Sequence, residues 1–154
     1  MSLSIRALIV LLMAGTFAGC SGSSTSPTTA TTPTGNVTNE VFTGTVPAAS
    51  NGVLASMSNP FTVAVGNGNL SVTLTSAVET MPDGTMLSTV TMGLALGTWS
   101  NGTCTVQTTT FTPAQGSSVA QLSGTIAAGS YCVQVSDITN QVGSVAYAVA
   151  VSHY

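Results

Sequence analysis

Residues 144–153 read SVAYAVAVSH, and this stretch decides the fold class. Val145, Tyr147, Val149 and Val151 stand at every second position, with Ala or Ser next to them. Side chains alternate between the two faces of a β-strand, so a period of two predicts a strand with one buried face. The same period recurs in four further stretches: Phe61-Val63-Val65, Leu70-Val72-Leu74, Val90-Met92-Leu94-Leu96 and Tyr131-Val133-Val135.

Turn signals separate these predicted strands. They are rich in Gly, Asn, Asp and Pro, the residues that accept turn conformations: Gly66-Asn67-Gly68, Pro82-Asp83-Gly84, Asn101-Gly102 and Ala128-Gly129. Lys, Glu and Arg, which favour helices, are nearly absent. The pattern predicts an all-β protein, a single antiparallel β-sandwich of about seven or eight strands, covering residues 40–154.

Only 3% of the 154 residues are charged, against about a quarter in ordinary soluble domains. Arg6 is the single Lys or Arg, and it lies in a segment that we expect to be removed. Without basic side chains a protein cannot neutralise phosphates, so nucleic acids and anionic lipid surfaces are poor partners.

The first twenty residues follow the three-part plan of a secretory signal. A basic start, Met1–Arg6, precedes the apolar run ALIVLLMA at 7–14, and small residues lead to Cys20. An N-terminal membrane helix is the alternative, but this run falls well short of the roughly 20 residues that a span requires. We therefore expect residues 1–19 to be a signal peptide.

The sequence Phe17-Ala18-Gly19-Cys20 resembles the lipobox of bacterial lipoproteins, with Phe17 where Leu is usual. The resemblance implies cleavage after Gly19, a diacylglyceryl group on the sulfur of Cys20, and an acyl chain such as palmitate on its amino group. Several such chains anchor a protein almost permanently. Ser21, in place of Asp, implies sorting to the outer rather than the inner membrane of the cell envelope.

Residues 20–39 are composed almost wholly of Ser, Thr, Pro, Gly and Asn after the cysteine. This composition offers nothing to bury and predicts a flexible tether. The expected organisation is a lipid anchor, a tether and one sandwich domain.

The chain has three cysteines, and an odd number in an exported protein leaves one to explain. If Cys20 carries lipid, Cys104 and Cys132 remain as a pair that an oxidising compartment would join in a disulfide. A zinc site is the alternative, but these two cysteines and His153 supply too few ligands.

The strand alternation leaves the position of this bridge open. It places Cys104 on the face of Val106, but Cys132 on the face of Gln134 and Ser136. Either a bulge shifts one strand, or the bridge lies on an outer face or near a strand end.

Two segments near the C-terminus, LSGTIAAGSYCVQVSD (122–137) and SVAYAVAVSH (144–153), resemble the final strands of bacterial pre-peptidase C-terminal domains. FTVAVGNGNLSVTLTSA (61–77) is similar to the paired early strands of that family. The resemblance implies a secreted or surface-displayed, jelly-roll-like β-sandwich. Its motifs are structural, so it implies a fold and not an activity.

Acidic residues offer a candidate calcium site. Glu79 and Asp83 are close in sequence, and together with loop carbonyls they provide the oxygen ligands that calcium prefers. The alternative role of Asp83 is to stabilise the Pro82-Asp83-Gly84 turn. Asp137 is expected in a loop, and no other metal or cofactor is predicted.

His153, the single histidine, lies one residue from the last and is expected to be exposed. No Gly-x-Ser-x-Gly element accompanies it, although a nucleophile elbow for a Ser-His-Asp triad requires one. We therefore predict that the protein is not an enzyme.

Trp99 is the aromatic residue most suited to a binding role, because it lies near the tip of a predicted hairpin at 94–106. Exposed, it would stack on a sugar ring or anchor a protein partner. Alternatively it packs over the strand of Cys104. Tyr131 and Tyr147 alternate with valines and are expected in the core.

The absence of charge suggests how the domain is used, because Lys and other charges normally guard sheet edges against further pairing. We expect a non-catalytic envelope protein whose sandwich contacts another β-domain or serves a structural role. A carbohydrate- or calcium-binding module is the alternative, with a cell-surface polysaccharide as its partner.

Overall fold

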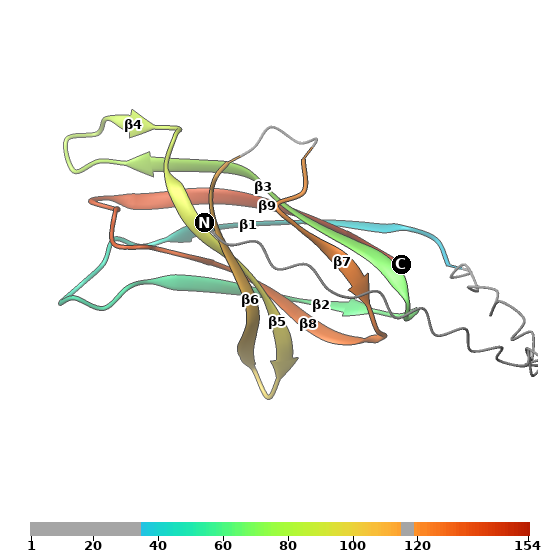
Figure 1. The fold of residues 1–154 in the computed structure, drawn as a ribbon. Helices are drawn as coiled ribbons and strands as arrows, with labels where there is room; N and C mark the ends of the chain where they lie inside the picture. The colour runs from blue at the N-terminus through green and yellow to red at the C-terminus, as the bar shows by residue number, and fades with distance from the viewer. Residues whose placement is uncertain (1–34, 115–118) are drawn as a thin grey trace, which may run out of the picture. The chain divides into compact units, whose positions relative to one another are not determined.

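The structure, a computed structural model, describes residues 35–114 and 119–154. Within these ranges every regular element is a β-strand, as predicted (Figure 1). The strands are β1 (Thr38–Val46), β2 (Ser56–Val63), β3 (Gly68–Thr80), β4 (Met86–Leu87), β5 (Thr91–Ser100), β6 (Thr103–Pro113), β7 (Leu122–Ile126), β8 (Gly129–Ser136) and β9 (Ser144–His153). Their number exceeds the expected seven or eight because β4, which has only two residues, carries no alternation to detect.

The strands form two antiparallel sheets that pack together as a β-sandwich (Figure 1). The first sheet has the order β1-β9-β3-β4, and β7 also pairs with β3. Because β7 pairs with Gly68–Val72 and β4 with Glu79–Thr80, both lie along the same side of β3 but at opposite ends. The second sheet has the order β2-β8-β5-β6.

The core is built from the predicted alternations. Val145, Val149 and Val151 are at most 1% exposed, and Tyr147 is 4% exposed. Inward-facing side chains of β1, β2, β3, β5, β7 and β8, together with Val90, complete the same cluster. Tyr131 departs from the prediction, because it is only partly buried and packs against the edge of the cluster.

The β5–β6 hairpin closes through the predicted Asn-Gly turn. Asn101 and Gly102 have φ angles of 51° and 77°. Asn and Gly tolerate this left-handed conformation, and a two-residue turn of this kind matches the twist of the flanking strands.

Both structural explanations left open for the disulfide hold. Cys104 and Cys132 are joined, with Cα atoms 5.8 Å apart. Cys132 alternates with the core residues Val133 and Val135 and so lies on the outer face of the second sheet. The β5–β6 register shifts between Leu96 and Gly97. A Cβ at Gly97 would overlap the carbonyl group of Thr105. Glycine is therefore needed at this point, where the backbones of β5 and β6 approach closely.

Candidate functional site

A hollow of about 350 Å³ opens beside β6 and β7 and is lined by residues of both sheets. We call it the β6–β7 hollow. Its apolar lining comprises Leu70, Leu96, Leu122, Ile126, Ala127 and Tyr131. Gly124 and four uncharged polar residues complete it: Gln107, Thr108, Ser123 and Thr125.

Sequence alternation explains why the hollow exists. Leu122, Gly124 and Ile126 of β7 stand opposite Val72, Leu70 and Gly68 of β3, on the face turned to the core. The middle position of β7 is therefore an inward-facing glycine. A Cβ placed on Gly124 would meet nothing within 4 Å, so the hollow occupies the space that an apolar side chain would otherwise fill.

A β-bulge shapes the opposite wall. Leu96 pairs with Thr108 and Gly97 pairs with Val106, which leaves Gln107 without a partner in β5. A bulge of this kind bends its strand and re-aims the extra side chain, and here Gln107 lines the hollow.

Tyr131 is held in place at the hollow by two contacts. Its hydroxyl donates a hydrogen bond to the carbonyl of Ala127 at 3.1 Å. Its ring stacks on Phe61 with the centroids 5.9 Å apart. The hollow thus combines a fixed aromatic ring, aliphatic side chains and uncharged hydrogen-bonding groups, a composition typical of ligand pockets.

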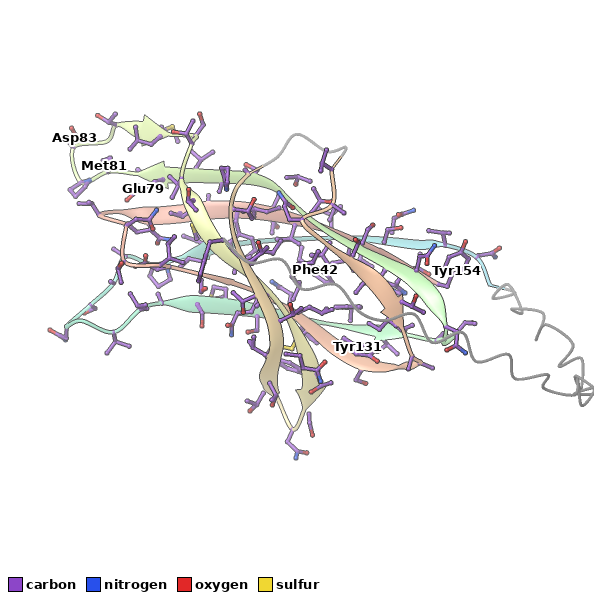
Figure 2. All side chains as sticks on the ribbon, in the orientation of Figure 1. Phe42, Glu79, Met81, Asp83, Tyr131 and Tyr154 are labelled. Carbon is purple, nitrogen blue, oxygen red and sulfur yellow. A yellow bond between two sulfur atoms is a disulfide. The ribbon has the colours of Figure 1, made fainter. Side chains whose placement is uncertain are left out.

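The structure gives Glu79 and Asp83, the candidate calcium ligands, different partners. Glu79 is 3% exposed, and its Oε1 accepts hydrogen bonds from the backbone N–H groups of Val142 and Gly143, both at 2.6 Å. Asp83 instead lies in the exposed turn before β4. Figure 2 shows both at the end of the sheets away from Tyr131 and Tyr154.

Asp83 stabilises its turn, the alternative role predicted for it. Its Oδ1 accepts a hydrogen bond from the backbone N–H of Thr85 at 2.9 Å. This bond, with a further one from the Thr85 side chain, lowers the pKa of Asp83 below the ordinary value of 3.8. Gly84, with φ at 86°, supplies the left-handed residue of the turn.

Trp99 lies near the hairpin tip, as expected, but not at the hollow. It pairs with Cys104 across the hairpin and is partly buried. It is neither part of the hydrophobic core nor among the residues that line the hollow.

The prediction that His153 is exposed is wrong. His153 is 2% exposed because it continues the inward alternation of β9. Its Nε2 lies 2.9 Å from Oε1 of Glu40 in β1, and its ring lies 5.5 Å from that of Phe61. The histidine therefore joins β1, β2 and β9.

Asp137 and Gln141, in the β8–β9 loop, are also buried. Asp137 is 2% exposed, and its Oδ1 accepts a hydrogen bond from the N–H of Thr139 at 2.8 Å. Asp137 Oδ2 and Gln141 Oε1 have no hydrogen-bond partner among the described residues. In the part of the chain that the structure describes, no three His, Cys, Asp or Glu side chains lie together in a way that would hold a metal ion.

Comparisons with protein-family models, curated proteins and solved structures find no match. The predicted signal peptide, Cys20 and most of the tether lie outside the described residues. Among residues 35–114 and 119–154, no helix is long and apolar enough to cross a membrane.

Proposed function

We propose that this protein is a non-catalytic, lipid-anchored component of the bacterial cell envelope, whose β-sandwich binds another envelope component at the β6–β7 hollow. The observation that carries the proposal is the hollow itself. It joins apolar side chains to uncharged polar ones, and no acidic or basic residue lines it.

The anchoring half of the proposal rests on the resemblance of residues 17–20 to a lipobox. Tether residues would lead from Cys20 to β1, which begins at Thr38. We expect attachment to the outer membrane, because Ser21 rather than Asp follows the cysteine. A pre-peptidase-like sandwich on such a tether would suit display at the cell surface or in the periplasm.

The non-catalytic part of the proposal is supported by the ionisable side chains, which make structural contacts. Glu79 holds the loop before β9, and His153 contacts Glu40 inside the sandwich. Neither lines the hollow, where Tyr131 is the single titratable residue. Binding without chemistry is the role that such a lining supports.

Anchoring is tested by labelling cells with radioactive palmitate and separating membranes from soluble protein. We expect wild-type chain to carry label and to sediment with the membranes. The Cys20→Ser variant should lose the label and leave the membrane fraction. Equal labelling of both chains, or an unlabelled wild type, would contradict lipidation at Cys20.

Binding is tested by capture on supported bilayers that hold the full-length lipidated chain. Detergent-extracted envelope proteins and purified cell-surface polysaccharide are offered in separate experiments, with and without calcium. The proposal predicts saturable retention that falls when Thr108 is replaced by Lys but persists with Thr109→Lys. Both threonines are exposed, but only Thr108 lines the hollow. If neither envelope proteins nor polysaccharide are retained, the proposed binding role is contradicted.

A carbohydrate-binding module is the second candidate. It is favoured by the arrangement of Tyr131 with Gln107 and Thr108, since sugars bind to aromatic rings flanked by hydrogen-bonding side chains. Retention of polysaccharide alone, lost in Thr108→Lys, would support this alternative. If the site lies at the hairpin instead, Trp99→Ala would abolish the retention.

Calcium could contribute to either role. The buried oxygens Asp137 Oδ2 and Gln141 Oε1 lack donors among the described residues, and oxygen is the ligand atom that calcium prefers. A melting temperature that rises with calcium in the wild type, but not in Asp137→Asn, would support bound calcium. An unchanged wild type would exclude it.

A further inference from the structure

We infer that the free edge of β7 binds an extended, uncharged segment of a partner protein, which adds to the first sheet and inserts an apolar side chain into the β6–β7 hollow beside Gly124. This inference rests on the proposed binding role and specifies its partner. Three properties of the described residues carry it: an open strand edge, a missing side chain and a hollow that no charged residue lines.

The open edge is provided by β7. Over the described residues β7 pairs with β3 alone, and β6 pairs with β5 alone. Along the side of β7 turned away from β3, alternate residues present backbone N–H and C=O groups that have no strand partner. An extended peptide satisfies such a row of groups, which is how strand addition gives affinity.

The missing side chain gives the site its specificity. Gly124 faces inward between Leu122 and Ile126, and space remains around it. A strand lying beside β7 would direct every second side chain to the same face. An apolar side chain there would complete the cluster of Leu70, Leu96 and Ile126, with the usual gain from burying apolar surface.

A second, more open hollow lies across the opposite face of the same strands. It is lined by residues of β3 and β7 alone: Asn69, Leu70, Ser71, Ser123, Gly124 and Thr125. Polar side chains dominate this face. An added strand would therefore place apolar and small polar side chains alternately, the period of two of an ordinary half-buried strand.

Charge limits the identity of the partner. No charged residue lines either hollow, and β6 and β7 contain none. A charged side chain entering the β6–β7 hollow would lose its hydration and find no opposite charge. The segment that binds is therefore uncharged over the residues that contact β7.

Another segment of this chain fits less well than a partner protein. Residues 21–34 contain no Leu, Ile, Val, Met or aromatic side chain to fill the hollow. In a second copy, two of the edge strands, β1 and β2, have the inward-facing Val46, Phe61 and Val63 already buried in their own core. A segment of a partner protein that is unpaired before binding has apolar side chains free to enter the hollow.

The test measures binding of a fluorescent peptide, acetyl-Thr-Val-Thr-Val-Thr-Val-Thr-amide, to the full-length chain in detergent by fluorescence anisotropy. Two further peptides carry N-methyl groups on the Val residues or on the Thr residues. The amides of alternate residues point to opposite edges of a strand, so one methylated peptide should bind normally. The other should bind at least tenfold more weakly, and equal binding of both would overturn strand addition.

The matched variants are Gly124→Leu and Thr109→Leu. Gly124→Leu fills the hollow from within, so we expect affinity to fall at least tenfold while resistance to urea stays equal or increases. Thr109→Leu, at an exposed position that lines neither hollow, should bind within twofold of wild type. Peptide binding unaffected by Gly124→Leu would overturn the inference, and the urea curve excludes misfolding as the cause of a loss.

Two further outcomes separate this inference from the proposed function. If no peptide binds but envelope proteins are still captured, strand addition at β7 is wrong and the binding role stands on another surface. If sedimentation shows a dimer that Gly124→Leu dissolves, a second copy occupies the site, which also overturns the inference. Binding of the peptide in the expected pattern supports it.

Discussion

At the scale of single residues, Glu79 is the carboxylate with the largest expected effect on stability. It accepts two backbone hydrogen bonds while 3% exposed. Replacing it by Ala leaves two buried backbone donors without their acceptor, which should lower the free energy of unfolding by about 3 kcal/mol. Urea denaturation of the wild type and Glu79→Ala measures this difference, and Glu79→Gln, which keeps an acceptor, should lie between them.

Asp83→Ala is the control for this prediction, because Asp83 bonds only within its own exposed turn. Its urea midpoint should remain close to that of the wild type. If Asp83→Ala destabilised the domain as much as Glu79→Ala, the separate roles assigned to the two carboxylates would be wrong.

Asp83 should also titrate abnormally. The hydrogen bonds from Thr85 favour the ionised carboxylate, so its pKa in the folded protein lies below 3.8. Its contribution to the turn is present above the unfolded value and is lost as the pH falls through the lowered pKa. A carbon-13 NMR titration should give a midpoint below 3.8, moving upward in Thr85→Val. A wild-type midpoint at or above the ordinary value would contradict the hydrogen bonding described.

The residue contacts show what the sequence could predict and what it could not. The turn role of Asp83 follows from neighbours two positions apart. The partners of Glu79 lie 63 and 64 positions away, and His153 meets Glu40 across 113 positions. Such contacts depend on the strand order, although the alternation of β9 already contained the signal that His153 faces inward.

At the scale of strands and hairpins, the Cys104–Cys132 bridge fastens the β5–β6 hairpin to β8. The two cysteines are separated by 28 positions, and closing a loop of this size stabilises a protein by about 3.6 kcal/mol in the chain-entropy account. The double variant Cys104→Ser/Cys132→Ser should unfold at a correspondingly lower urea concentration. Reduction of the wild type should reproduce the loss.

The urea midpoint of the double variant should not change further on adding reductant. A double variant with the same urea midpoint as the oxidised wild type would show that packing alone holds the hairpin. This result would contradict the fastening role.

The strands themselves were largely predictable, because a period of two with Asn-Gly and Pro-Asp-Gly turns reports directly on local structure. The hollow was not. The glycine at 124 interrupts an inward alternation in LSGTI, which is a visible signal. That the interruption opens a cavity, however, depends on the pairing of β7 with β3 and on the bulge at Gln107 in β6.

At the scale of the whole molecule, the first described residues lie close to the end of β3 at which the β6–β7 hollow opens. Gly35, the first residue that the structure describes, lies next to Val65 and Tyr154. The β6–β7 hollow adjoins the same end of β3, since the N–H of Asn67 bonds to the carbonyl of Ile126. A lipid anchor at Cys20, as proposed, would therefore hold the protein by a tether that joins near the hollow that we propose as its binding site.

Photo-cross-linking in the producing cells tests most directly whether the β6–β7 hollow receives a segment of another envelope protein, as we propose. A photoreactive phenylalanine is placed at Thr108, which lines the hollow, or at Thr109, which does not. We predict an adduct with a second protein from position 108, little from position 109, and loss of the adduct in the Gly124→Leu background. No adduct from position 108, or equal adducts from both positions, would contradict the account.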